Sequence, residues 1–283
     1  MFPANTFLIG AQKSGTTFLA ALLDHSPQVC VSDPKEPHYL THNHSRGEAF
    51  YRDCFSDPSA PVRLDASTTY TVLRPRAQME VPDAPGILDP VPDRIRAAVP
   101  DARLIYIMRD PVKRAVSAWR HNARSKPAVQ VPQSLIAAMQ EDPMLLLTGR
   151  YADQIERYLE VFAPEQFLFL DFRELTRDPL TVLARTCGFL GIEPPQVDPD
   201  AIGEKRNSNY QMTGAGHLFE TYKKKIPGLQ RNLRRLLPDQ AQRVLIDRVL
   251  RRPSEVSFYD EAEAAALFED DRARVRTLTG LEI

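Results

Sequence analysis

The stretch Thr6–His25, TFLIGAQKSGTTFLAALLDH, decides the fold of this chain. Its first residues, Thr6–Ala11, form a short apolar run that reaches a glycine, which predicts a buried strand. After a polar turn, the apolar spacing of Phe18–His25 predicts a helix. Strand, turn and helix in this order would point the N–H groups of the turn and of the helix N-terminus at one place, which favours a phosphate there.

The turn Gly10–Thr17 resembles a Walker A loop but differs from it at a decisive position. A Walker A loop ends in Gly-Lys-Ser/Thr, with the lysine on the β- and γ-phosphates and the hydroxyl on Mg²⁺. Here Gly15 is followed by Thr16, and the lysine is Lys13, inside the turn. The displaced lysine suits a shorter anion. Taken alone, the fragment is also compatible with a polar turn that only caps a helix.

Strand-like and helix-like segments alternate along the following part of the chain. Further strands are predicted at Val29–Ser32, Arg63–Ser67, Arg103–Met108 and Gln166–Phe172, and helices at Val112–Asn122, Pro179–Leu190, 217–237, 239–251 and 260–278. This alternation predicts an α/β fold of the P-loop-like three-layer kind. A central, mostly parallel sheet would carry helices on both faces, and the C-terminal part would be helical. We interpret residues 1–283 as a single domain.

Composition excludes several classes of protein. The 36 Lys and Arg residues nearly balance 37 Asp and Glu, which argues against a surface built for nucleic acid or for an anionic membrane. Three cysteines without a CxxC pair suggest neither a disulfide framework nor a cysteine zinc site. No apolar window approaches the roughly 20 residues of a spanning helix. We therefore expect a cytoplasmic enzyme without membrane insertion, and its oligomeric state stays open.

A second motif follows the clearest buried strand, Arg103–Met108. It reads RDPVKRAVS and runs from Arg109 to Ser117. A nucleotide kinase would more often place a metal-holding aspartate on the strand itself, whereas here an arginine leads and offers a fork suited to phosphate oxygens. Ser117 lies about two helical turns further on, so it shares a face with Arg109 only if Arg109 leads into the helix.

At this point the chain resembles the PAPS-dependent sulfotransferase family, in which PAPS is 3′-phosphoadenosine 5′-phosphosulfate. KSGTTFL and RDPVKRAVSAW are similar to its two PAPS-binding motifs. The resemblance implies that PAPS is the co-substrate, with the 3′-phosphate on Arg109 and Ser117. It makes Asp110 a structural residue. The residues implied to hold the 5′-phosphosulfate are Lys13, Ser14, Gly15, Thr16 and Thr17.

The resemblance extends over most of the chain. Phe167–Gly191 is similar to a later strand and helix of the family, and Lys205 and Arg206 begin a segment, KRNSN, that matches a loop closing over the nucleotide. The C-terminal FEDDRARVRTLTG is similar to the end of many bacterial members. We therefore expect a bacterial member, closer to the glycosaminoglycan (Golgi-type) branch than to the cytosolic aryl and steroid branch.

The catalytic base is expected in the loop KEPHY, residues 35–39. In the glycosaminoglycan-type branch, a glutamate at the matching place removes the proton of the acceptor, which implies that role for Glu36. His38 is the rival base, because imidazole titrates near neutrality and the other branch uses histidine. The chain departs from the pattern twice: Ala66 stands where a second catalytic lysine is common, and Thr41 where some relatives carry an acidic residue.

These residues predict in-line sulfuryl transfer to a hydroxyl or amine of a glycan, lipid or small molecule. Lys13 would stabilise the bridging oxygen and the phosphate left behind, and no metal ion is required. Two alternatives are a P-loop kinase and a non-catalytic nucleotide-binding module that kept the fold. The basic segment 205–252 fits a solvated helical face, and an acidic acceptor or partner is the other interpretation.

Overall fold

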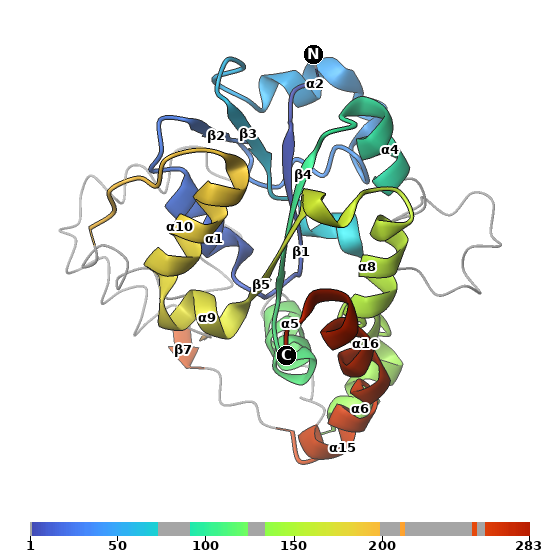
Figure 1. Ribbon diagram of the computed structural model, residues 1–283. Coiled ribbons are helices and arrows are strands. Elements are labelled where there is room, and N and C mark those ends of the chain that lie inside the picture. Colours follow the sequence, from blue (N-terminus) through green and yellow to red (C-terminus); the bar gives the residue numbers. More distant parts are fainter. Residues whose placement is uncertain (1, 73–90, 124–133, 199–209, 213–250, 254–257) are drawn as a thin grey trace.

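The computed structural model describes residues 2–72, 91–123, 134–198, 210–212, 251–253 and 258–283. Its centre is a five-stranded sheet in the order β2-β3-β1-β4-β5, and every neighbouring pair is parallel (Figure 1). The strands are β1 (Thr6–Gly10), β2 (Val29–Val31), β3 (Val62–Asp65), β4 (Arg103–Met108) and β5 (Phe167–Asp171). All five predicted strands are confirmed.

Helices and short 3₁₀ turns connect and follow these strands. The helices are α1 (Thr16–Leu23), α2 (Gly47–Asp53), α4 (Val91–Ala98), α5 (Pro111–Ala123), α6 (Leu135–Glu141), α7 (Met144–Leu147), α8 (Tyr151–Leu159), α9 (Phe172–Arg177), α10 (Pro179–Leu190), α15 (Glu261–Ala266) and α16 (Glu269–Thr279). The 3₁₀ turns are η1 (His44–Arg46), η2 (Thr68–Thr71) and η3 (Pro164–Gln166). A separate antiparallel pair joins β6 (Tyr210–Met212) to β7 (Arg251–Pro253).

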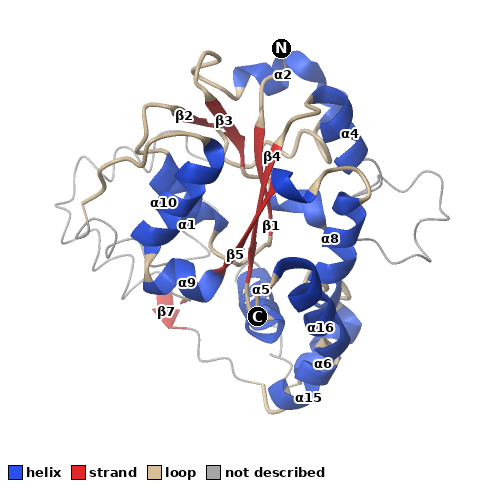
Figure 2. Cartoon of the chain, viewed as in Figure 1, coloured by secondary structure: helices blue, strands red, loops and turns tan. Residues whose placement is uncertain are grey.

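The side-chain alternation of the strands produces the three layers. In β1, Leu8 packs into the cluster formed with α1, α9 and α10, whereas Phe7 and Ile9 pack into the cluster formed with α4 and α8. Both sets are almost fully buried, as the pleat of a strand covered on two faces requires. The helices on either side of the sheet are visible in Figure 2. The predicted three-layer α/β class is confirmed.

The C-terminal part differs from the sequence-based expectation. The helix predicted at 260–278 is two helices, α15 and α16, separated at Leu267 and Phe268. The break buries the Phe268 ring in a third apolar cluster, beside Gly149, where an added Cβ would lie 2.9 Å from that ring. The helix predicted at 217–237 lies outside the described residues. So does the one at 239–251 except for Arg251, which opens β7 instead.

Candidate active site

The turn between β1 and α1, which is the predicted anion loop, contains two residues with a left-handed backbone. Lys13 adopts the left-handed region with a φ of 68°, and Gly15 follows with a φ of 90°. A Cβ on Gly15 would lie 3.0 Å from the Phe172 ring and 3.1 Å from Leu175, so both the φ and the space require glycine. The carbonyl of Gly15 accepts the N–H of Leu19 at 3.0 Å, which starts α1 directly after the turn.

Arg109 joins this turn from the end of β4. Its Nη1 donates to the carbonyl of Lys13 at 3.2 Å, and its guanidinium lies 4.7 Å from the centre of the Phe172 ring. The Tyr151 hydroxyl donates to the carbonyl of Arg109 at 2.9 Å. Burial lowers the pKa of Arg109 from its usual value. The structure thus brings together the two motifs that the sequence separates by almost a hundred residues.

A buried polar atom in this region fits an anionic ligand. Ser14 is fully buried with its side chain next to that of Tyr151, and the Nε of Arg109 has no hydrogen-bond partner among the described residues. Buried donors without partners cost free energy unless a ligand or water satisfies them. Thr16 is also buried, whereas Thr17 is exposed on the first turn of α1. The phosphosulfate and 3′-phosphate of PAPS supply acceptors of the kind that the Nε of Arg109 lacks.

The other residues that the resemblance implies for the nucleotide motifs lie on other elements or outside the described residues. Ser117 lies on α5 and is 9% exposed. Lys205 and Arg206 lie outside the described residues. Asp110 has the structural contacts that the resemblance implies: one oxygen accepts the N–H of Lys113 at 2.8 Å at the start of α5, and the other pairs with Nη2 of Arg272 on α16 at 2.8 Å.

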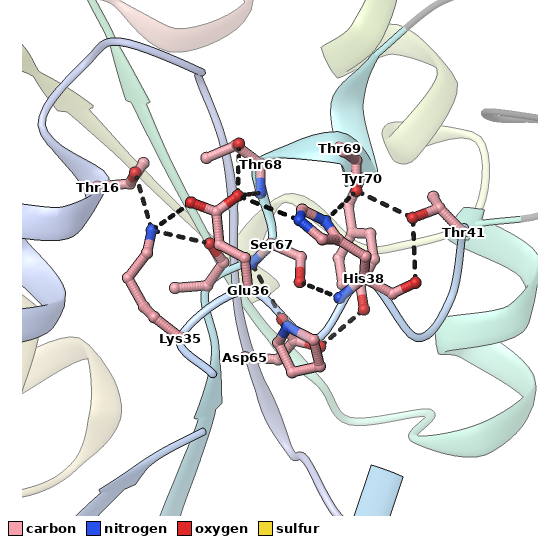
Figure 3. A network of polar contacts seen from close by, with 12 residues as sticks. Thr16, Lys35, Glu36, His38, Thr41, Asp65, Ser67, Thr68, Thr69 and Tyr70 are labelled. Atoms are coloured by element: carbon pink, nitrogen blue, oxygen red, sulfur yellow. Dashed lines mark hydrogen bonds and ion pairs between the residues drawn. The ribbon is translucent and has the colours of Figure 1, made fainter. Parts of the chain in front are cut away.

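The loop after β2 carries Glu36 to the same edge of the sheet (Figure 3). One Glu36 oxygen lies 2.7 Å from Nζ of Lys35, and the other accepts the Thr68 hydroxyl at 3.0 Å. Burial raises the pKa of Glu36, but the Lys35 ammonium and the hydrogen bonds from Thr68 outweigh it, so the net pKa is below the usual value. Glu36 is therefore ionised at neutral pH.

His38 lies beside Glu36, with its Nε2 3.9 Å from a Glu36 oxygen. Its Nδ1 and the Thr69 hydroxyl are 2.9 Å apart, and that hydroxyl lies 3.0 Å from the hydroxyl of Thr41. Burial lowers the pKa of His38, which outweighs the raising effect of Glu36. The backbone of His38 has a φ of 51°. Among the described non-glycine residues, only His38 and Lys13 have a positive φ, and they occupy the two loops of this site.

A buried carboxylate stabilises the loop that carries Glu36 and His38. Asp65, at the end of β3, is fully buried and accepts the hydroxyls of Tyr70 at 2.7 Å and Tyr51 at 2.8 Å. The Tyr70 oxygen in turn accepts the N–H of Leu40 at 3.2 Å. Burial raises the pKa of Asp65, although its hydrogen bonds oppose the shift. Asp65 and Tyr70 thereby fix the backbone two residues after His38.

Sequence reasoning missed Lys35. Lys35 is part of the loop KEPHY, but no role was predicted for it, and position 66 is an alanine where a catalytic lysine is common. In the structure, Nζ of Lys35 lies 3.3 Å from the carbonyl of Ala66 and 3.5 Å from Oγ1 of Thr16. Lys35 is 31 residues from Ala66 and 19 from Thr16 along the chain, and no local sequence pattern predicts contacts over such separations.

The fold is that of a P-loop-like α/β protein, and the predicted anion loop lies next to the ion pair of Lys35 and Glu36. A family model described as the sulfotransferase domain matches residues 3–212. The chain belongs to the sulfotransferase family. A crystal structure of a sulfotransferase from Alicyclobacillus acidocaldarius has the same fold, with a TM-score of 0.63 at 23% identity over 99% of this chain and 97% of that chain.

Two similar curated proteins are heparan sulfate enzymes. Human heparan sulfate glucosamine 3-O-sulfotransferase 3B1 is 30% identical over 192 residues, 66% of this chain and 45% of that protein. Mouse bifunctional heparan sulfate N-deacetylase/N-sulfotransferase 3 is 29% identical over 204 residues, 66% of this chain and 22% of that protein. The chain thus spans less than half the length of either relative. The sequence-based identification of the family is confirmed, and the names of both relatives agree with the expected glycosaminoglycan branch.

Two features of the described residues bear on other predictions. Within them, no helix combines the length and apolar character needed to cross a membrane. No group of three or more His, Cys, Asp or Glu side chains is arranged there to hold a metal ion. The cytoplasmic location, the bacterial source and independence from metal ions stay predictions.

Proposed function

We propose that this chain transfers a sulfuryl group from PAPS to a hydroxyl or amine of an acceptor, with Glu36 as the general base. One observation carries the proposal: the carboxylate of Glu36 is tied through Lys35 to Thr16 in the anion loop. A base and a donor-binding loop that lie this close suit in-line transfer, in which attacking and leaving oxygens lie on opposite sides of the sulfur.

In this reaction the acceptor gives its proton to Glu36 while its oxygen or nitrogen forms a bond to sulfur. The bond from sulfur to the bridging oxygen breaks, and its electron pair stays on the phosphate of the leaving 3′-phosphoadenosine 5′-phosphate (PAP). Lys13 and the N–H groups of the anion loop stabilise that charge. Arg109, Ser117, Lys205 and Arg206 bind the nucleotide, with the first two on its 3′-phosphate. Residues 1–283 act as one domain.

The surroundings of Glu36 and His38 support this division of roles. Glu36 is ionised over the neutral range, and its two oxygens are held in place by Lys35 and Thr68. The Nδ1 atom of His38 forms a hydrogen bond with Thr69, and its Nε2 atom lies next to Glu36. This arrangement suits a residue that lines the acceptor site. The relatives named above act on heparan sulfate by O- and by N-sulfation, so a glycan acceptor with either group fits the proposal.

The kinase alternative receives less support. Asp110, the residue that could be mistaken for a metal-holding strand aspartate, is engaged by the start of α5 and by Arg272. The turn also lacks the Gly-Lys-Ser/Thr ending that a Walker A loop needs. The non-catalytic alternative would be favoured by a missing base, and Glu36 is present with a defined environment.

The test has a binding part and a transfer part. Calorimetry in a chelating buffer should show binding of PAP, with a rise in melting temperature, because only the folded state has the site. Tighter binding of ATP with Mg²⁺ would replace this proposal by the kinase. Incubation with PAPS labelled in its sulfuryl group should then transfer label to a fraction of host glycans or metabolites.

A further inference from the structure

The ammonium of Lys35 lies between the anion loop and the proposed base. Its Nζ is 2.7 Å from a Glu36 oxygen, 3.5 Å from Oγ1 of Thr16 and 3.3 Å from the carbonyl of Ala66. Figure 3 shows it between the Thr16 side chain and the Glu36 carboxylate. The Lys35 side chain is 23% exposed, so it lies at the edge of the site and a ligand can reach it.

The three contacts differ in strength. The ion pair with Glu36 is short, whereas the contacts with Thr16 and Ala66 are at the long end of hydrogen bonding. An ammonium has three donors and no fixed plane, so the two weaker contacts can be exchanged for oxygens of a ligand at small cost. Thr16 opens α1 and belongs to the predicted anion loop.

We propose that Lys35 is a further catalytic residue that binds a non-bridging oxygen of the sulfuryl group during transfer. The proposal rests on the proposed function, since it needs PAPS in the anion loop. Lys35 keeps its proton throughout: the acceptor's proton goes to Glu36, and the electron pair of the broken sulfur–oxygen bond goes to the PAP phosphate. The ammonium compensates the charge of the sulfuryl oxygens while they pass between two negatively charged partners.

The pairing with Glu36 has a consequence for the base. In the ligand-free protein the Lys35 ammonium lowers the pKa of Glu36, which makes the carboxylate a weaker proton acceptor. When part of that charge is engaged by a sulfuryl oxygen, the pKa of Glu36 rises towards its usual value. The base would thus gain strength when the donor is bound.

The discriminating measurement compares two nucleotides that differ only in the sulfuryl group. Calorimetry without acceptor gives the affinities of wild-type protein, Lys35→Gln and Lys35→Arg for PAP and for PAPS. We expect Lys35→Gln to weaken PAPS binding by roughly tenfold or more and PAP binding by less than about twofold, because the lost contact is a charge-assisted one to the sulfuryl group. Lys35→Arg should recover most of the PAPS affinity.

Arg52→Gln is the matched control. It also removes one positive charge from a pair with a glutamate, Glu48, but on the exposed surface of α2, so both affinities should stay at the wild-type values. Circular dichroism and melting temperature verify the fold of each variant.

Equal losses for PAP and PAPS in Lys35→Gln would assign Lys35 to the phosphate instead, and no loss for either would leave it as a partner of Glu36 alone. Either result overturns this inference and leaves the proposed function intact. Wild-type protein that binds neither nucleotide would overturn both.

Discussion

The proposed site has a nucleotide half and an acceptor half, and the two are built in different ways. The nucleotide half is a strand, a turn and a helix that follow each other directly, and the backbone of Lys13 and Gly15 sets its shape. The acceptor half is a network of side chains from two loops about 30 residues apart, in which Glu36 meets Thr68 and His38 meets Thr69. Backbone conformation therefore defines the first half, and tertiary packing defines the second.

Different parts of the molecule also stabilise the two halves. Behind the nucleotide half, Asp110 pairs with Arg272 of α16, and Tyr151 of α8 holds the carbonyl of Arg109. Behind the acceptor half, the buried Asp65 and Tyr70 hold the loop at Leu40. Apart from the Lys35 contacts that link Glu36 to Thr16, a change in one half should therefore leave the other largely intact, and variants can test that separation.

The largest effect is expected for Glu36→Gln, in the acceptor half. The variant keeps the size of the side chain and removes its basicity, so turnover should fall by about 10² to 10⁴ while PAP affinity holds. The wild-type rate should fall only as pH drops into the acidic range in which Glu36 takes up a proton, because the pKa of Glu36 lies below its usual value in the ligand-free protein and rises towards that value when the donor is bound. Steady-state kinetics with an identified acceptor measure both effects.

His38→Ala is the companion variant, and it should mainly raise the Michaelis constant of the acceptor. Near-normal turnover in Glu36→Gln together with a collapse in His38→Ala would exchange the two roles. Glu48→Gln, which removes an exposed carboxylate on α2, is the control for the loss of one charge.

The next largest effect is expected for Lys13→Ala, in the nucleotide half. Charge develops on the leaving phosphate, so an interaction there strengthens in the transition state. Turnover should fall by more than PAP affinity does, by roughly tenfold or more. Kinetics and calorimetry on the same preparation provide the two numbers. Equal losses would make Lys13 a binding residue only.

This division also explains what the sequence could predict. The turn Gly10–Thr17 and the strands β1 and β4 have local patterns, so the fold class and the strand, turn and helix at the N-terminus could be predicted from them. That Arg109 and the turn with Lys13 belong to one site was implied only by the family resemblance, and their hydrogen bond was not predicted. The place of the Lys35 ammonium could not be predicted, because it depends on how the loop after β2 packs against the end of β3. The split between α15 and α16 depends on tertiary burial of Phe268.

A smaller effect is expected for Arg109→Ala. Charge-assisted hydrogen bonds to phosphate contribute roughly 1.5–3 kcal/mol, which is about a tenfold to hundredfold change in affinity. The loss should appear for PAP and be much smaller for adenosine 5′-phosphate, which lacks the 3′-phosphate. Calorimetry with both nucleotides gives the ratio of affinities. A ratio that the substitution leaves unchanged would remove Arg109 from this role.

The smallest effect concerns the support behind the nucleotide half. Asp271 of α16 accepts the N–H groups of Tyr151 at 3.0 Å and Ala152 at 2.9 Å, which holds the start of α8. Burial raises the pKa of Asp271 from 3.8 to about 6, and the two hydrogen bonds oppose the rise only in part. Between these two values the folded protein binds more protons at Asp271 than the unfolded chain does. Stability from this residue is therefore lost as pH rises through the window.

Asp271→Asn removes the ionisation and keeps one oxygen as an acceptor. The difference in melting temperature, wild type minus variant, should therefore become more negative from about pH 4 to about pH 6 and stay constant above it. Scanning calorimetry in buffers across this range measures the difference. Asp270→Asn, which removes the neighbouring carboxylate with an 89% exposed side chain, is the control for the loss of one charge on α16. A flat difference for Asp271→Asn would mean that the carboxylate is ionised without cost, and that α8 and Arg109 do not depend on its protonation.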